Sequence, residues 1–226
     1  MQPKRFRLII SAIVRFGLGF ASIGLMLFFC AGTVQYLNGW LFIGVLVVPM
    51  LVFGSVLLIR DPAALERRLN SREPDKAQVA VIVASAVMFI SMFVVAGLDF
   101  RLGWSQMVLP ISIAAAAVLL AGYLLFAVVI MQNSYAARVV DVFEDQKVIT
   151  TGLYSIVRHP MYLATLMIFL PMPIILGSWF AVIPMLIYPA ILVPRIKNEE
   201  ALLIRELDGY SEYLQQVRYR LLPFIW

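Results

Sequence analysis

The chain has 226 residues, of which 62% are hydrophobic and only 14% charged, and its formal net charge is +5. Soluble domains carry about 25% charged residues, so the composition excludes a soluble globular protein and indicates an integral membrane protein. The single cysteine, Cys30, excludes an intrachain disulfide and a cluster of thiolate metal ligands.

Successive apolar runs predict an all-α, polytopic integral membrane protein with about six transmembrane helices, since a span needs roughly 20 apolar residues. The first run has no small-residue cleavage site, and we interpret it as a retained helix rather than a signal peptide. Arg15, about one turn into this run, is expected to reach the membrane surface. The expected spans are residues 11–33, 40–59, 77–97, 105–131, 160–176 and 179–194.

The last two expected spans form a tight helical hairpin, because only Gly177 and Ser178 separate them. Prolines make this hairpin irregular, and they persist in a bilayer where neighbouring helices or a cavity satisfy the freed backbone groups. These prolines are Pro171, Pro173, Pro184, Pro189 and Pro194. From Arg195 to Trp226 the pattern returns to that of a soluble helix, which predicts a C-terminal helix outside the membrane.

Most Lys and Arg residues fall in alternate segments of the chain. Of the 18, 16 lie in the N-terminus, residues 60–76, residues 132–159 and the C-terminal segment, whereas the intervening links hold only Arg101. The positive-inside rule then predicts that both termini and the two long loops are cytoplasmic. The basic excess is therefore a topology signal, helped by anionic membrane lipids, and not a sign of nucleic-acid binding.

The predicted topology divides the chain into two parts. Residues 1–131 are expected to form N-terminal membrane helices 1–4, and residues 132–226 a module of loop, hairpin and C-terminal helix.

The only histidine, His159, lies in the stretch Gly152-Leu-Tyr-Ser-Ile-Val-Arg-His-Pro-Met-Tyr162. A residue before proline is pushed out of the helical conformation, and proline is well tolerated in the first turn of a helix. We therefore expect His159 in extended backbone just ahead of a membrane helix that begins near Pro160. The positive end of that helix would suit an anionic group at the membrane–water boundary. The alternative is a turn and helix cap without a functional role.

Two adjacent acids, Glu199 and Glu200, follow on the same predicted side of the membrane. Neighbouring helical positions point about 100° apart, so we expect the two carboxylates to have different roles. One would face a cavity while the other pairs with Arg195 or Arg205. The alternative is that both are solvated acids at the start of a helix.

Other common sites are excluded by the sequence. The loop acids Asp141, Glu144 and Asp145 have no histidine or cysteine companions, so no metal site is predicted. There is no nucleophile elbow, phosphate-binding glycine loop, HExxH or CxxC motif. The glycines of residues 17–20 lie in an apolar span without the strand that a dinucleotide fingerprint needs, which excludes a soluble Rossmann enzyme.

The C-terminal third resembles the isoprenylcysteine carboxyl methyltransferase family and, more broadly, the membrane methyltransferases that include phospholipid N-methyltransferases. The pattern is GxYxxxRHPxY, a downstream EE, and YxxYxxxVRYRLLPxxW, over about residues 145–226. The family's usual proline and glycine are replaced here by Leu153 and Ala164. The matching residues are Gly152, Tyr154, Arg158, His159, Pro160, Tyr162, Glu199, Glu200, Tyr210, Tyr213, Val217, Arg218, Tyr219, Arg220, Pro223 and Trp226.

The resemblance implies S-adenosylmethionine as methyl donor and a lipophilic acceptor that reaches the site from the bilayer. The group that it implies is methylated is a carboxylate. By carry-over, the cofactor-binding residues are Tyr154, Arg158, His159, Pro160, Tyr162, Glu199, Glu200, Tyr210 and Tyr213. The catalytic residues are Arg195, Glu199 and Arg218, with Arg220 as a further candidate for holding an acceptor carboxylate. The site would lie on the cytoplasmic side.

Three other functions stay open. Phospholipid N-methylation would need a base near the acceptor amine, and none is evident beyond the two glutamates. An NADPH-dependent enzyme like the sterol reductases would need a cluster of Arg or Lys for the 2′-phosphate. A non-enzymatic scaffold or small transporter is the third. Against a transporter, no expected span has a charged residue at mid-depth, and the chain shows no internal inverted repeat.

Overall fold

The computed structural model describes residues 3–69, 76–136, 142 and 146–226. Within these residues the chain is helical and contains no β-strand, as the sequence predicts. Four helices are long and apolar enough to cross a membrane: α1 (Pro3–Ala31), α2 (Leu37–Arg60), α4 (Lys76–Leu102) and α5 (Leu109–Gln132). They correspond to the first four expected spans.

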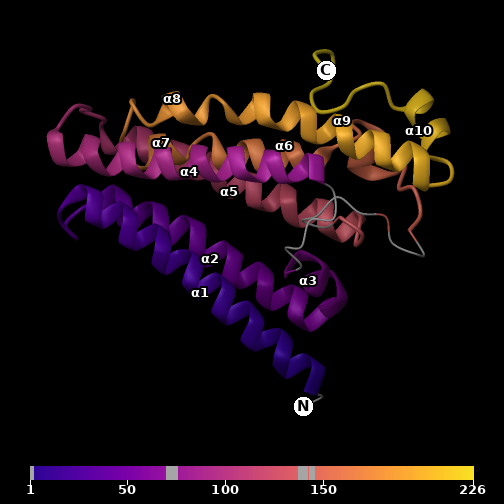
Figure 1. The fold of residues 1–226 in the computed structure, drawn as a ribbon, viewed down its shortest axis with the longest axis horizontal. Helices are drawn as coiled ribbons and strands as arrows, with labels where there is room; N and C mark the ends of the chain where they lie inside the picture. The colour runs from indigo at the N-terminus through magenta and orange to yellow at the C-terminus, as the bar shows by residue number, and fades with distance from the viewer. Residues whose placement is uncertain (1–2, 70–75, 137–141, 143–145) are drawn as a thin grey trace.

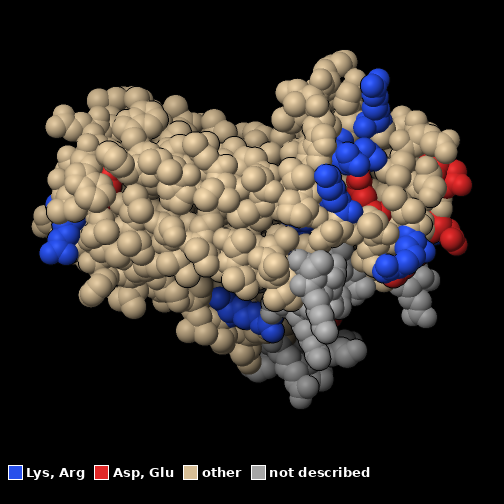
Figure 2. All heavy atoms as spheres, turned by 45° about the horizontal axis from the view of Figure 1, so that its top comes forward, with Lys and Arg blue, Asp and Glu red and all other residues tan. Residues whose placement is uncertain are grey.

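The surface agrees with a membrane location. A 24-residue helix is about 36 Å long, enough to cross the ~30 Å hydrocarbon core. On the face shown in Figure 2, most charged residues gather toward the two ends of the molecule and leave a broad uncharged belt between them. The protein is therefore an integral membrane protein.

The helices form a layer with a crossing pair beside it (Figure 1). The layer consists of four helices whose axes are nearly aligned: α4, α5, α6 (Pro160–Phe169) and α9 (Tyr188–Glu206). Helices α1 and α2 lie side by side and cross it at an angle, approaching it at one end and diverging at the other. Two glycines permit close contacts. A Cβ on Gly97 would lie 2.6 Å from Cys30 Cβ of α1, and one on Gly122 would lie 2.9 Å from Ile168 of α6.

A short helix follows α2. Helix α3 (Pro62–Leu69) begins where the Asp61 carboxylate accepts a hydrogen bond from the backbone N–H of Ala64 at 2.9 Å. Its apolar residues Ala64, Leu65 and Leu69 are buried against α2 and α5, in a cluster that includes Leu57 and Ile130. Helix α3 thus lies within residues 60–76, one of the basic segments that the sequence places outside the membrane.

The hairpin differs from the expected pair of continuous spans. It consists of α6, α7 (Met172–Ile175), a turn at Gly177 with φ of +78°, α8 (Val182–Met185) and α9. Prolines at 171, 173, 184 and 189 lack the N–H that a continuous helix requires, and the interruptions lie near them. By contrast, no helix ends at the expected boundary after Pro194. Helix α9 contains this proline and continues to Glu206.

Polar side chains tie the hairpin turn to the α4–α5 link. The buried carboxylate of Asp99 accepts hydrogen bonds from the Ser178 hydroxyl and from both the backbone N–H and the hydroxyl of Ser105, the last two at 2.7 Å. The Ser105 hydroxyl in turn accepts from the N–H of Trp179 at 3.0 Å. This network closes one end of the molecule. Helix α10 (Tyr210–Gln216) lies at the other end.

Candidate active site

Most of the residues predicted to form a site line one cavity beside α9 and α10. Its volume is about 90 Å³. The walls come from the end of α5, the 3₁₀ turn η1 (Gly152–Ser155), the start of α6, α9 and α10. The predicted site residues in its lining are Tyr154, Arg158, His159, Tyr162, Arg195, Glu199, Tyr210 and Tyr213.

The backbone fixes the histidine in place. His159 has φ of −126° and ψ of 60°, outside the helical region, and α6 begins at Pro160, as the His-Pro pair predicts. The N–H of His159 donates to the carbonyl of Arg220 at 2.8 Å, and that of Arg158 donates to the carbonyl of Tyr219 at 2.9 Å. The C-terminal segment thus pairs with the segment that precedes α6. Residues about 60 positions apart build one wall.

Glu200 lies at the centre of a cationic cluster. Its carboxylate is 3.2 Å from Arg158 Nη1, 3.2 Å from His159 Nε2 and 2.8 Å from Arg220 Nε. Burial tends to raise the pKa of Glu200, but hydrogen bonds from His159 and Arg220 and the charges of His159 and Arg158 outweigh it and lower the pKa. Glu200 is 4% exposed and is not part of the cavity lining. It is the acid that pairs with cations, although its partners are not the expected Arg195 or Arg205.

Glu199 faces the cavity instead. Its carboxylate accepts a hydrogen bond from the Tyr162 hydroxyl, which itself accepts one from Arg195 Nε at 3.1 Å. His159 Nδ1 lies 4.0 Å from Glu199 Oε1. The imidazole therefore stands between the two acids, with one ring nitrogen toward each. This division between the two acids follows the 100° offset of neighbouring helical residues.

Three tyrosines, Tyr154, Tyr210 and Tyr213, form an aromatic part of the cavity wall. The Tyr213 hydroxyl donates to the Tyr154 carbonyl at 2.6 Å, and the Tyr154 hydroxyl accepts from Asn133 Nδ2 at 3.1 Å. Burial raises the pKa of Tyr154 to about 12 and also raises the pKa of Tyr210 and Tyr213. All three phenols are neutral at physiological pH. The wall is aromatic and uncharged, with hydroxyl groups as its polar atoms.

Two buried polar atoms at the cavity lack partners among the described residues. They are the hydroxyl oxygen of Tyr210 and Nε of Arg158. A buried donor without a partner costs free energy, so such groups are uncommon unless a ligand or water satisfies them. These two atoms fit a polar ligand in this cavity.

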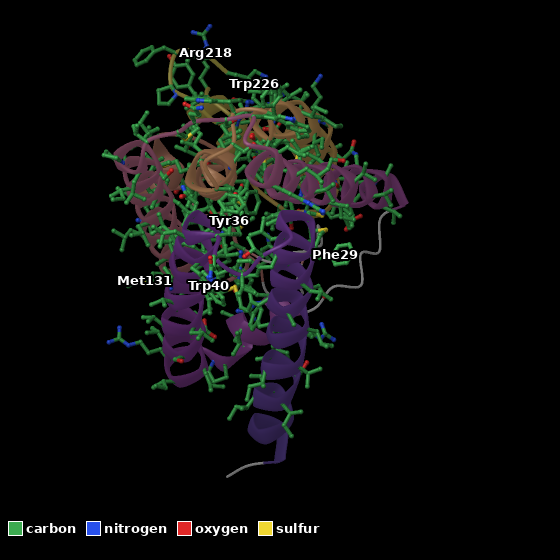
Figure 3. The ribbon with its side chains drawn as sticks, turned by 90° about the vertical axis from the view of Figure 1, so that its left-hand side faces the viewer. Phe29, Tyr36, Trp40, Met131, Arg218 and Trp226 are labelled. Atoms are coloured by element: carbon green, nitrogen blue, oxygen red, sulfur yellow. The ribbon has the colours of Figure 1, made fainter. Side chains whose placement is uncertain are left out.

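The structure does not bring every predicted residue to the cavity. Pro160 starts α6 but does not line it, and the Arg218 side chain is exposed and points away from the bundle (Figure 3). Arg220, two residues further in an extended segment, points toward Glu200 instead. The cavity also includes Asn133 and Lys147, which sequence reasoning missed because each looked like an ordinary residue at the edge of a polar loop.

No group of three or more His, Cys, Asp or Glu side chains that could hold a metal occurs in the part of the chain that the structure describes. The acids Asp141, Glu144 and Asp145, weighed as a metal site, lie outside the described residues.

Two comparisons confirm the resemblance seen in the C-terminal motifs. The family model of isoprenylcysteine carboxyl methyltransferase (ICMT) matches residues 113–205. The fold is similar to that of the eukaryotic intramembrane Ras methyltransferase ICMT, with a TM-score of 0.55 and 23% identity over 91% of this chain and 75% of that chain. No curated protein matches the sequence. The family match begins within α5, earlier than the motifs indicated, and the structural match extends the likeness in fold to most of the chain.

Proposed function

We propose that this protein is an integral membrane methyltransferase that uses S-adenosylmethionine and methylates a carboxylate on a lipophilic acceptor. The observation that carries the proposal is the cavity in which Glu199, Tyr162, His159 and the unpaired hydroxyl of Tyr210 converge. The family match over residues 113–205 includes the first three of these residues.

The residues of the cavity fit the charges of the methyl donor. S-adenosylmethionine, when bound, supplies an electrophilic methyl group on a cationic sulfonium, and it also carries an amino and a carboxylate group. Glu199 offers a carboxylate for a cationic group, while Arg158 and Lys147 in the lining offer positive charge for an anionic one. The Tyr210 hydroxyl and Arg158 Nε supply donors that nothing else in the described structure uses. Aromatic side chains complete the wall.

The other side chains of the site would orient the reacting groups. Transfer of a methyl group from a sulfonium to a carboxylate neutralises one positive and one negative charge and releases no proton. Alignment and exclusion of water therefore matter more than a strong base. Tyr162 is held between Arg195 and Glu199, so these three side chains restrain one another and keep the Glu199 carboxylate in place. Glu200 holds Arg158 and the His159 ring against α9.

The proposed topology extends beyond the four long helices. We infer that the two arms of the broken hairpin also cross the membrane, which gives six spans. The cavity then lies on the cytoplasmic side with both termini, because Arg101 belongs to the opposite end, where Asp99 and Ser178 meet. The cavity is built largely from residues 132–226, in agreement with the proposed division into a membrane part and a cofactor-binding module.

The test is equilibrium binding of S-adenosylhomocysteine and NADPH, in parallel, to the full chain purified in detergent. We expect the methyl-donor product to bind and NADPH not to bind, and Glu199→Gln to weaken binding by about tenfold or more. Glu206→Gln is the matched control, because Glu206 is exposed and pairs with its neighbour Arg205. Absence of S-adenosylhomocysteine binding to a monodisperse sample would refute the proposal, and binding of NADPH alone would favour a reductase.

A further inference from the structure

Helix α3 belongs to the N-terminal part of the chain, yet it contacts the wall of the cavity that Glu199 faces, called here the Glu199 cavity. The family match begins at residue 113, so α3 lies outside it. Figure 1 shows α3 at the end of the molecule where α5 also ends. The segment that follows α5, residues 133–136, supplies three residues of the cavity lining: Asn133, Tyr135 and Ala136.

Arg68 reaches this segment from α3. Its Nη1 donates to the carbonyl of Ala136 at 2.7 Å, and its Nη1 and Nη2 lie 3.7 and 3.6 Å from the sulfur of Met161. Its guanidinium carbon is 4.3 Å from the centre of the Phe126 ring of α5. Ala136 and Met161 line the Glu199 cavity, whereas Arg68 is not part of the lining. Arg68 therefore contacts the cavity wall from behind.

Arg67, its neighbour, binds the same segment. Its Nε donates to the carbonyl of Ser134 at 3.0 Å, and its guanidinium carbon lies 5.9 Å from the centre of the Tyr135 ring. Both arginines thus bind backbone carbonyls just beyond the C-terminal end of α5. That end of a helix carries a partial negative charge and carbonyls without helical partners, so a cation is favourable there.

Helix α3 is itself held in place at both ends and along one face. The Asp61 carboxylate caps its start, and Arg15 of α1 donates to the carbonyl of Leu69, its last residue. Ala136 packs against the apolar cluster that includes Leu65 and Leu69 of α3. The arginines are therefore mounted on a fixed helix, which can hold the segment that they bind.

The end of α5 holds Tyr154 on its other side. Asn133 Nδ2 donates to the Tyr154 hydroxyl at 3.1 Å, and the side-chain oxygen of Gln132 accepts from the N–H of Leu153 at 2.9 Å. The approach is close, because a Cβ on Gly152, whose φ is +61°, would lie 2.6 Å from the Gln132 amide. Contacts are thus continuous from α3 through the end of α5 to a tyrosine of the cavity wall.

The charge of Arg68 is also felt at this wall. Burial lowers the pKa of Arg68 to about 10, and the nearby Tyr154 raises it, so the guanidinium is cationic at neutral pH. A buried charged group needs hydrogen-bond partners, and the Ala136 carbonyl is one of them. Replacement of Arg68 by an apolar residue would leave this carbonyl without its donor and would loosen the segment that contains Asn133.

We propose that Arg67 and Arg68 are positioning residues for the Glu199 cavity. Through the segment after α5 they hold Asn133 and Tyr154 in the arrangement that binds the methyl donor. The inference rests on the proposed function, because the methyl donor is taken as the ligand of this cavity. It makes ligand affinity depend on a helix of the N-terminal part that the family match does not include.

The first measurement is calorimetric titration of S-adenosylhomocysteine into variants of the full chain in detergent. Arg68→Met removes the donors and keeps much of the side-chain length, and we expect about tenfold weaker binding. Arg68→Lys keeps a charged donor and should recover part of the affinity. Wild-type affinity in Arg68→Met overturns the proposal, and so does Arg68→Lys that binds no better than Arg68→Met. Arg67→Met replaces Arg68→Met in this test if the latter gives no monodisperse sample.

Two controls separate positioning from a general loss of stability. Gly97→Ala disturbs the α1–α4 contact, since its Cβ would lie 2.6 Å from Cys30 Cβ, and it should leave the affinity for S-adenosylhomocysteine unchanged. Arg205→Gln removes a cation from an exposed ion pair of α9 and should also bind as the wild type does. An equal loss of affinity in Gly97→Ala and Arg68→Met overturns the positioning role, because any destabilised variant would then lose the ligand.

A double variant tests the route through the end of α5. Asn133→Ala removes the hydrogen bond to the Tyr154 hydroxyl and should weaken S-adenosylhomocysteine binding by about tenfold. If Arg68 acts through the same segment, Arg68→Met combined with Asn133→Ala should also bind about tenfold more weakly than the wild type. A loss of about a hundredfold would show that the two residues act independently, which overturns this route.

Hydrogen exchange without ligand separates this inference from the proposed function. The N–H of Ala136 donates to the Asn133 carbonyl at 3.1 Å, and that of Leu153 donates to the Gln132 side chain. We expect both amides to exchange at least about tenfold faster in Arg68→Met than in the wild type. If they do so while the wild type binds no S-adenosylhomocysteine, the methyltransferase proposal fails and the held wall stands. Unchanged exchange overturns the positioning role, whether or not the ligand binds.

Discussion

Glu200 Oε2 and Arg220 Nε lie 2.8 Å apart and join the helix that carries both adjacent acids to the C-terminal segment. The same carboxylate contacts Arg158 and His159, which precede α6. Three segments of the chain therefore meet at one buried anion. Glu199, its neighbour, contacts Tyr162 and faces the cavity. Adjacent acids in the sequence are thus separated into one that holds the wall together and one that is available to a ligand.

Replacement of the two acids should therefore have different consequences for stability. Glu200→Gln leaves Arg158 and Arg220 without their buried counter-ion, and we expect a loss of about 3 kcal/mol in the free energy of unfolding. Glu199→Gln retains an acceptor for the Tyr162 hydroxyl and should cost less than about 1 kcal/mol. Denaturant unfolding in detergent, followed by tryptophan fluorescence, measures both. Equal losses in the two variants would contradict this division.

The Glu200 cluster also predicts a dependence of stability on acid pH. The pKa of Glu200 is lowered in the folded protein, so its contribution is fully present above the ordinary glutamate pKa of about 4.3 and is lost as pH falls through the folded value. The stability difference between wild type and Glu200→Gln should be constant near neutral pH and shrink below about pH 4. Thermal melts of both proteins from pH 7 to pH 3 measure it. A difference that stays constant over this range would show that the carboxylate does not titrate as expected.

The unpaired hydroxyl of Tyr210 predicts a variant that loses ligand affinity without losing stability. In Tyr210→Phe no hydrogen bond of the described structure is broken, and removal of a buried hydroxyl without a partner should be neutral or stabilising. We expect S-adenosylhomocysteine binding to weaken by about tenfold. Tyr213→Phe is the matched control, because it removes the bond to the Tyr154 carbonyl and should cost about 1 kcal/mol of stability. Calorimetric titration and melting curves on both variants measure this, and unchanged affinity in Tyr210→Phe would remove Tyr210 from the binding residues.

The contact between α1 and α4 predicts a packing effect at Gly97. A Cβ there would lie 2.6 Å from Cys30 Cβ and 2.8 Å from the Leu27 carbonyl oxygen, so Gly97→Ala should cost about 1–3 kcal/mol. Gly44→Ala in α2 is the control, because nothing lies within 4 Å of its added Cβ. That substitution should be neutral or stabilising, since alanine favours the helix by up to ~1 kcal/mol. Unfolding in a denaturing detergent compares the two, and similar values would mean that the helices can separate at this contact without cost.

The sequence was sufficient to predict the four long helices and the start of α6. A long apolar run has one stable form in a bilayer, and Pro160 restricts both itself and His159, so these features depend on local residues alone. The broken hairpin was harder to predict, because neighbouring helices determine whether a proline interrupts a membrane helix. Pro194, inside the continuous α9, shows that the residue type alone does not decide.

The side-chain placements that depend on distant segments were the least predictable. Arg218 and Arg220 lie two residues apart in a short extended segment, and only its pairing with Arg158 and His159 determines which arginine turns inward. In the sequence, Arg68 is one of several cationic residues in a charged segment. In the structure, α3 places its guanidinium against Phe126 and Met161. The sequence signal that could have indicated it is the position of Arg68 beside Leu65 and Leu69, which lie on the buried face of a helix.

The continuity of α9 has a consequence for how the protein responds to its lipid surroundings. Tyr188, at its start, packs against Phe89 and Phe169 within the helix layer, and Glu199 lies 11 residues further along the same helix, or about 16 Å. Pro194 lies between them and lacks a backbone N–H, yet α9 continues through it to Glu206. A change in bilayer thickness that shifts the hairpin is therefore expected to shift the Glu199 carboxylate through the same helix. The depth of the Glu199 cavity relative to the membrane therefore depends on the length of α9 between Tyr188 and Glu199.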